Sequence, residues 1–175
     1  MIDIKNKGNC SGCHACMSVC PQNAIKMVGD SDGFLFPEIN RELCVNCGLC
    51  EKSCQIMHPI TVSREPVAYA CNHKDDSIRA QSSSGGVFTA ISRWIIEQGG
   101  IVFGAGYDEN LNVCHLSVER VEDLHLLRGS KYVQSKIGET YKKVKRHLDQ
   151  GRLVLFSGTP CQVDGLLHCL RKDYN

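Results

Sequence analysis

The chain has 175 residues, of which 22% are charged, and its formal net charge is +1 at pH 7. This balance lacks the basic footprint of a nucleic-acid-binding protein, so we expect no nucleic-acid partner. Its apolar runs, such as residues 153–156, are far too short to span a bilayer. The twelve cysteines follow an N-terminus without an apolar signal region, and we therefore expect a reduced, cytoplasmic location in an anaerobe.

The first third of the chain is built around two cysteine-rich loops. A short edge strand is predicted over residues 1–7, before the first loop. Residues 21–27 are expected to lead into a second strand, and a third is predicted over 33–39, before the second loop. Both loops have the spacing C-x2-C-x2-C-x3-C, so the segment is an internal repeat. A connection punctuated by prolines, residues 59–66, ends the predicted domain.

The repeated spacing predicts two 4Fe-4S clusters. Three thiolates at steps of three converge on one cubic cluster, while the fourth points away and binds the other cluster. We therefore assign cluster one to Cys10, Cys13, Cys16 and Cys54, and cluster two to Cys20, Cys44, Cys47 and Cys50. In this respect residues 1–58 resemble a bacterial two-cluster 4Fe-4S ferredoxin, an α+β domain.

Structural zinc and disulfides are the two alternative uses of these cysteines. Structural zinc takes two well-separated pairs of ligands, whereas each run here supplies four cysteines within eleven residues. Disulfides require an oxidising compartment. Gln55 stands where proline often follows such a run, which changes no ligand. His14, inside the first loop, either donates a hydrogen bond near a sulfur or is an exposed loop residue.

From residue 67 the pattern changes to alternating strands and helices, which predicts an α/β domain over 67–175. Strands are expected over residues 67–71, 101–107, 112–118 and 153–156, the first and last of them buried. A short helix is expected over 122–127, and a longer one around Tyr141, Val144 and Leu148. Two further helices are expected to bury apolar faces made of Val87, Ile91, Trp94 and Ile95, and of Val163, Leu166, Leu167 and Leu170.

Two loops of this domain precede helices. Ser82–Gly86 exposes a helix N-terminus that favours a phosphate, although a plain serine cap with a glycine turn explains it equally well. In the loop 157–162, Thr159 is expected as the N-cap and Pro160 as the first helical residue. Cys161 then lies in the first turn, where the helix dipole favours a thiolate. It is a cluster ligand, a redox thiol, a flavin contact or buried filler; filler is expected for Cys71, Cys114 and Cys169.

Three blocks, SSGGV (83–87), RGSKYVQS (128–135) and FSGTPCQ (156–162), are similar in order and spacing to the coenzyme F-420 hydrogenase/dehydrogenase beta-subunit family. The resemblance implies a flavoprotein that binds FAD and iron–sulfur clusters and exchanges electrons with coenzyme F-420 or another acceptor. It implies that Ser84, Gly85 and Gly86 line the flavin phosphates, with Ser130 and Lys131 nearby. Thr159, Pro160 and the catalytic Cys161 would form a second wall. Family members continue into a further C-terminal domain, so we expect a fragment or a shortened protein.

We therefore expect an iron–sulfur electron-transfer oxidoreductase subunit that relays electrons between 4Fe-4S clusters and a flavin or deazaflavin. The alternative is a ferredoxin-type carrier whose α/β extension docks a partner without flavin. In either case the expected partners are redox proteins or hydrogenase/dehydrogenase-type subunits.

Overall fold

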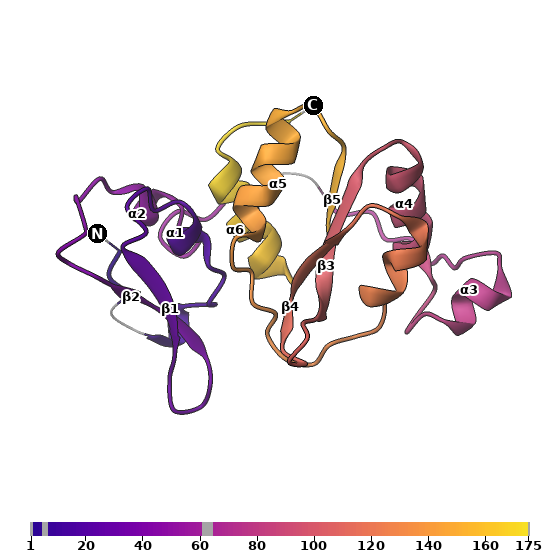
Figure 1. The fold of residues 1–175 in the computed structure, drawn as a ribbon, viewed down its shortest axis with the longest axis horizontal. Helices are drawn as coiled ribbons and strands as arrows, with labels where there is room; N and C mark the ends of the chain where they lie inside the picture. Colours follow the sequence, from indigo (N-terminus) through magenta and orange to yellow (C-terminus); the bar gives the residue numbers. More distant parts are fainter. Residues whose placement is uncertain (1, 5–6, 61–64, 175) are drawn as a thin grey trace. The chain divides into compact units, whose positions relative to one another are not determined.

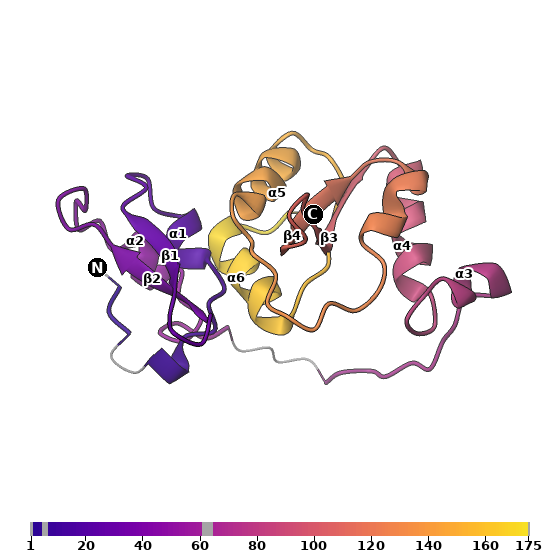
Figure 2. The same cartoon turned by 60° about the horizontal axis from the view of Figure 1, so that its bottom comes forward.

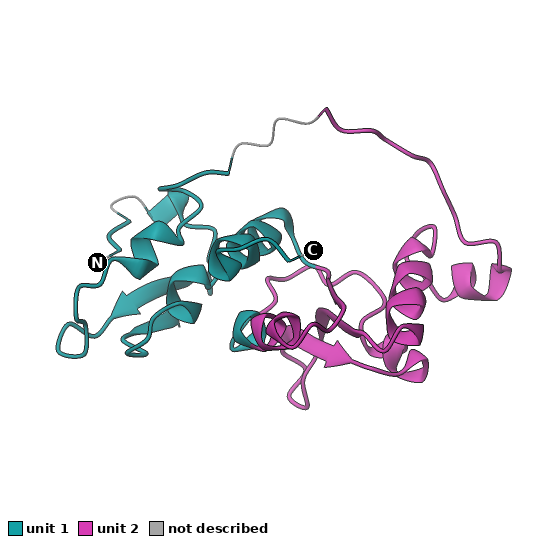
Figure 3. Ribbon diagram, turned by 90° about the horizontal axis from the view of Figure 1, so that it is seen from above, with its two compact units in different colours: residues 1–61, 137–142, 158–175 teal, residues 62–136, 143–157 magenta. Residues whose placement is uncertain are grey.

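The computed structural model describes residues 2–4, 7–60 and 65–174, and its contacts divide the chain into two compact units (Figure 3). Unit 1 comprises Met1–Thr61, Ile137–Lys142 and Gly158–Asn175, and unit 2 comprises Val62–Lys136 and Lys143–Ser157. The boundary predicted at residues 59–66 follows chain order, whereas the contacts group two later segments with the N-terminal residues.

Unit 1 contains an antiparallel pair of strands, β1 (Ile25–Gly29) and β2 (Leu35–Ile39), as the sequence predicts. The turn between them is closed by Asp30, whose Oδ1 accepts from the N–H groups of Asp32 and Phe34 at 3.0 Å. The strand predicted over residues 1–7 is wrong for the residues of this segment that the structure describes. Residues 2–4 form no strand, residue 7 begins the 3-10 helix η1 (Lys7–Asn9), and positions 1, 5 and 6 lie outside the described residues.

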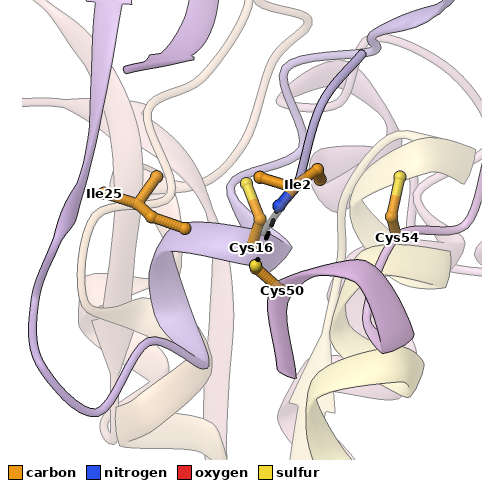
Figure 4. Close-up of a cluster of buried hydrophobic side chains, with 5 residues drawn as sticks. All are labelled: Ile2, Cys16, Ile25, Cys50 and Cys54. Carbon is orange, nitrogen blue, oxygen red and sulfur yellow. Dashed lines mark hydrogen bonds between the residues drawn. The ribbon is translucent and has the colours of Figure 1, made fainter. Parts of the chain in front are cut away.

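Three helices complete unit 1: α1 (Ala15–Ser18), α2 (Leu49–Lys52) and α6 (Pro160–Leu170). Thr159 is the N-cap of α6 and Pro160 its first residue, as predicted. The buried core of the unit mixes aliphatic side chains with thiols: Ile2, Cys16, Ile25, Cys50 and Cys54 (Figure 4).

Unit 2 contains a three-stranded sheet in the order β4-β3-β5, made of β3 (Ile101–Tyr107), β4 (Val113–Val118) and β5 (Val154–Phe156). β3 pairs antiparallel with β4 and parallel with β5. α4 (Val87–Glu97) and α5 (Thr140–Asp149) lie on either side of β3 (Figures 1 and 2). Successive side chains of a strand point to opposite faces of the sheet, which explains this arrangement. Val102 packs in the same core cluster as Ile95 of α4, whereas the ring centroid of the next residue, Phe103, lies 6.2 Å from that of His147 of α5.

Two smaller helices belong to the same unit. α3 (Asp76–Ala80) is capped by the Asp75 carboxylate, which accepts from the backbone of Ser77 and Ile78. The helix predicted over 122–127 is the 3-10 helix η2 (Val121–Leu126). Its Leu124 is fully buried and packs with the core residues Ile95, Val102, Val118 and Leu127.

Two predicted strands differ in the structure. Residues 67–71 form no strand and are exposed, including Cys71 and Tyr69, which is 82% exposed. A short apolar run is buried only where a neighbouring strand edge receives it, and no edge of the β4-β3-β5 sheet does. Residues 153–156 do contain β5, but it is half-buried because it pairs with β3 alone, at the edge of the sheet.

The helix faces also differ from the expected ones. Helix α4 buries Thr89, Ser92 and Ile95, while Ile91 is exposed and Trp94 is 55% exposed. Helix α6 buries Leu166 and Leu170, as predicted, together with Gly165 and Cys169, while Val163 and Leu167 are exposed. Hydrophobicity located both helices and part of each buried face, and small side chains complete those faces.

Candidate metal centres and candidate cofactor site

The two cysteine loops have the same backbone path. In the first loop Gly12 and His14 have positive φ angles of 60° and 66°; in the second, Asn46 and Gly48 have 52° and 73°. Each loop thus places one glycine and one larger residue in left-handed conformation, in opposite order. These two turns direct three successive thiols of each loop toward the same side.

The hydrogen bonds after each loop repeat as well. The N–H of Ser18 donates to the His14 carbonyl at 3.0 Å, and the N–H of Lys52 donates to the Gly48 carbonyl at 3.2 Å. One short helix therefore follows each loop and carries its fourth cysteine away from the first three. The internal repeat predicted from spacing is confirmed at the level of the backbone.

A small cavity, partly open to solvent, lies beside the first loop. Its lining includes Cys10, Cys13 and Cys16 from the first repeat and Cys54 from the second. Aliphatic side chains, among them Ile2, Ile4 and Met27, form the rest of the wall.

A second small cavity, also partly open to solvent, lies beside the second loop. Its lining includes the remaining four cysteines, Cys20, Cys44, Cys47 and Cys50, with Ile25 and Ile39 among the apolar neighbours. Backbone N–H groups point at two of these sulfurs: Ile2 donates to Cys50 (Figure 4) and Ala24 donates to Cys20, both at 3.3 Å. Four thiols, an apolar wall and N–H···S bonds are the surroundings that a 4Fe-4S cluster requires, so the residues fit that group.

Burial raises the pKa values of Cys10, Cys13 and Cys16, and thiolates placed close together raise them further. Without a compensating cation these thiols stay protonated, whereas iron binding would deprotonate them and release protons. All twelve cysteines lie in the described residues and none is disulfide-bonded. Within those residues no three His, Cys, Asp or Glu side chains converge as they would on a single metal ion.

Two residues near the first cavity are explained by the structure. Gln55 is buried, and its Nε2 donates to Ser11 Oγ at 2.8 Å, so it ties the exit of the second repeat to the first loop. A proline at this position has no side-chain amide to make that bond. His14 is buried, so of its two interpretations the exposed loop residue is wrong.

The glycines of the second candidate site are required by geometry. Gly86 has φ +77° and is the N-cap of α4. A Cβ at Gly85 would stand 2.7 Å from the Cys71 carbonyl oxygen, so a larger residue there requires the backbone to move. Both glycines thus let the chain turn tightly before the helix.

The structure brings the second block beside this loop. Arg128 donates from Nε to Thr89 Oγ1 at 3.1 Å and from Nη1 to Gln81 Oε1 at 2.7 Å. Ser130 Oγ lies 3.4 Å from Ser83 Oγ. Lys131 donates to the Arg128 carbonyl at 2.7 Å, and partial burial lowers the pKa of its ammonium group.

Thr159, Pro160 and Cys161 begin helix α6 in unit 1, while Ser84, Gly85, Gly86, Ser130 and Lys131 belong to unit 2. Gln162 Oε1 accepts from the N–H of Thr159 at 3.0 Å, and Cys161 Sγ lies 3.1 Å from Thr159 Oγ1. Cys161 is therefore a half-buried thiol with a hydroxyl neighbour in the first helical turn. That the two groups share one site stays a prediction.

One residue of the motif region was missed by sequence reasoning. His115 of β4 is buried; its Nδ1 lies 2.8 Å from Ser135 Oγ and its Nε2 lies 3.0 Å from the Ser157 carbonyl oxygen. Its ring stacks on Phe156 at 5.0 Å. Since a carbonyl only accepts, Nε2 carries the proton, and burial lowers the pKa of the ring. A histidine in the middle of an apolar strand was the available signal.

Comparison with known proteins defines the class of the N-terminal part. Residues 9–56 match the family model described as a 4Fe-4S dicluster domain. The chain therefore begins with a ferredoxin-like 4Fe-4S domain, which a mixed α/β region follows, and iron–sulfur electron transfer is the class of function that the match supports.

Most of the chain is similar to a coenzyme F420-dependent sulfite reductase of Methanocaldococcus jannaschii, with 29% identity over 171 residues. The match covers 94% of this chain and 26% of that protein, so the chain spans about a quarter of its relative's length. Every helix in the described part of the chain is too short or too polar to span a bilayer.

Proposed function

We propose that this chain relays electrons through two 4Fe-4S clusters in its N-terminal domain, as part of an oxidoreductase. The observation that carries the proposal is the grouping of the thiols. Each of two cavities is lined by four cysteines, three from one repeat and one from the other. We assign cluster one to the cavity of Cys10, Cys13, Cys16 and Cys54, and cluster two to the cavity of Cys20, Cys44, Cys47 and Cys50.

Each cluster would supply a centre that takes up or gives up one electron at a time. The protein's own contribution is to hold the thiolates, exclude water with Ile2, Ile25 and Ile39, and donate backbone N–H groups to the sulfurs. These are the means by which a protein adjusts the reduction potential of such a group.

We further propose that the α/β region binds FAD. The support is the tight glycine turn at Gly85 and Gly86 before α4, with Ser130 beside it, and the resemblance of these blocks to a flavin-binding family. Ser84, Gly85 and Gly86 would hold the phosphates, with Ser130 and Lys131 nearby, and Thr159, Pro160 and Cys161 would approach the flavin. A flavin exchanges electrons singly with clusters and in pairs with a two-electron acceptor.

The acceptor that we propose is coenzyme F-420, because the M. jannaschii relative is named for dependence on it. Sulfite is not proposed, since the chain spans only about a quarter of that protein. We propose redox proteins or hydrogenase/dehydrogenase-type subunits as partners. We also propose a cytoplasmic location, where reducing conditions keep the thiols available.

Anaerobic purification followed by iron, sulfide and flavin analysis tests the proposal. We expect about eight irons per chain, the content of two cubanes, together with bound flavin. Eight irons without flavin would favour the alternative, a ferredoxin-type carrier whose α/β region docks a partner. Zinc in place of iron, even after anaerobic reconstitution, would contradict both.

A further inference from the structure

Helix α6 packs against the first cysteine loop, although about 140 residues separate them along the chain. A Cβ built on Gly165 would lie 3.1 Å from Tyr141 Oη and 3.2 Å from both Cβ and Sγ of Cys13. The helix backbone therefore lies close to a cysteine proposed for cluster one, and a methyl group at this position would require these neighbours to move by a few tenths of an ångström.

Three hydrogen bonds hold the helix in this place. Cys169 Sγ donates to the Ala15 carbonyl of α1 at 3.6 Å, and Tyr141 Oη donates to the Gln162 carbonyl at 2.8 Å. His168 Nε2 donates to the His58 carbonyl, just beyond the second repeat, at 2.6 Å. Cys169 and Tyr141 are buried, so the interface is well packed.

The two cluster sites are unequal in exposure. Two of the four cysteines around the first cavity, Cys16 and Cys54, are buried, and none of the four is exposed. Around the second cavity Cys50 is buried and Cys47 is exposed. Because solvent exposure changes the potential and the stability of an iron–sulfur cluster, the same spacing gives two different sites.

We propose that helix α6 supports the cluster-one site from behind the first loop and that Gly165 is the positioning residue that lets it pack against Cys13. The inference rests on the proposed cluster function. The helix starts at Thr159–Cys161, so a single helix joins this loop to the cluster-one site. Cluster two is the site with an exposed ligand, Cys47.

The test is the Gly165→Ala variant of the full chain, purified anaerobically beside the wild type. The new methyl group would press on Tyr141 Oη and on Cys13. Once iron fixes the Cys13 sulfur, we expect α6 to shift instead. We expect the electron paramagnetic resonance signal of cluster one to change and its midpoint potential to shift, and the iron content to fall from about eight toward about four per chain. The Cys10→Ala and Cys44→Ala variants, each expected to keep one cluster, assign the two signals.

Gly29→Ala is the matched control, since Gly29 lies in the same unit, has no positive φ and has no atom within 4 Å of an added Cβ. It should leave both signals and the iron content unchanged. A Gly165→Ala chain that keeps both clusters with wild-type signals, or loses only cluster two, contradicts the proposed role of α6.

A second measurement needs no variant. Iron release from the wild-type chain to a chelator should consume the cluster-two signal first, and simultaneous or reversed loss contradicts the proposal. A wild-type chain that takes up no iron would overturn the proposed function itself. Two clusters of equal accessibility would overturn only the role of α6.

Discussion

The two units of this chain obtain their cores by different means. In unit 2 the core consists of apolar side chains from several elements, among them an eleven-residue helix and a seven-residue strand, with Leu124 and Val102 fully buried. In unit 1 the strands have five residues, two of the helices have four, and three of the five core residues are cysteines. Ordinary hydrophobic burial explains the first, whereas the second is built around sites for metal.

The difference indicates where each unit obtains its folding free energy. Small units with few apolar residues depend on metals or other cross-links for stability. The buried thiols of unit 1 would form apolar-lined cavities without iron and a rigid cross-linked core with it. We therefore expect metal loss to affect unit 1 and apolar truncation to affect unit 2.

The largest effect should come from removing the iron. Chelation of the reconstituted chain after oxidation should unfold the cysteine loops and the β1–β2 pair, while β3 keeps its protection, because only unit 1 contains the cluster sites. Amide hydrogen exchange of Ile25–Gly29 and Ile101–Tyr107 measures this.

The Cys16→Ala variant should act in the same direction and remove about four irons per chain, the content of one cubane. Cys114→Ala is its control, because that thiol lies in unit 2 and lines neither cavity. Equal exchange in both segments after iron loss would break the comparison between the units.

Truncating the core of unit 2 should have the opposite signature. Leu124→Ala removes a fully buried side chain and should lower the free energy of unfolding of this unit by about 3 kcal/mol. Urea unfolding followed by segment-resolved exchange checks the value. The iron content should stay that of the wild type, and a loss of iron would mean that the units are not independent.

The buried histidine should matter next. His115→Ala leaves the Ser157 carbonyl and the Ser135 hydroxyl without this partner, which should destabilise unit 2 by about 2 kcal/mol. Equilibrium unfolding at neutral pH measures the change. His125→Ala, at an exposed site, is the control and should stay within about 0.5 kcal/mol of the wild type.

A smaller effect is expected in the second cysteine loop. Gly48 has φ +73° and only Glu51 Oε2 near an added Cβ, so Gly48→Ala costs conformational energy and causes no clash. We expect a loss of about 1 kcal/mol from the stability of unit 1, against almost none for Gly29→Ala. Chemical unfolding of both variants decides it, and equal stabilities would show that the left-handed turn is not strained.

The smallest effect is the pH dependence of unit 2. Burial lowers the pKa of His115 in the folded chain, while the unfolded chain keeps a value near ~6.5. Below that pH the unfolded chain binds a proton that the folded chain resists, so stability falls as the pH drops and is fully retained above it. Between about pH 5 and 8 the free energy of unfolding should therefore depend less on pH in the His115→Gln variant than in the wild type. An unchanged dependence would assign it to other groups.

Sequence reasoning succeeded where the determinants are local. The positions of β1 and β2, the strands around residues 101–107 and 113–118, and the start of α6 at Pro160 all depend on neighbouring residues. It failed for residues 67–71, whose apolar composition predicted burial. It also failed for the face of α4, where Thr89 and Ser92 are buried and Trp94 is not.

The sequence by itself determined the two cysteine loops, because ligand spacing, glycine positions and short-range hydrogen bonds lie within a dozen residues of one another. The same spacing predicted the two groups of thiols that line the cavities. Only the tertiary structure decided that Gly165 of α6 lies beside Cys13, since this contact joins segments far apart in the chain. Periodicity shows that a helix has a face to bury, but the surface that receives it is a property of the whole fold.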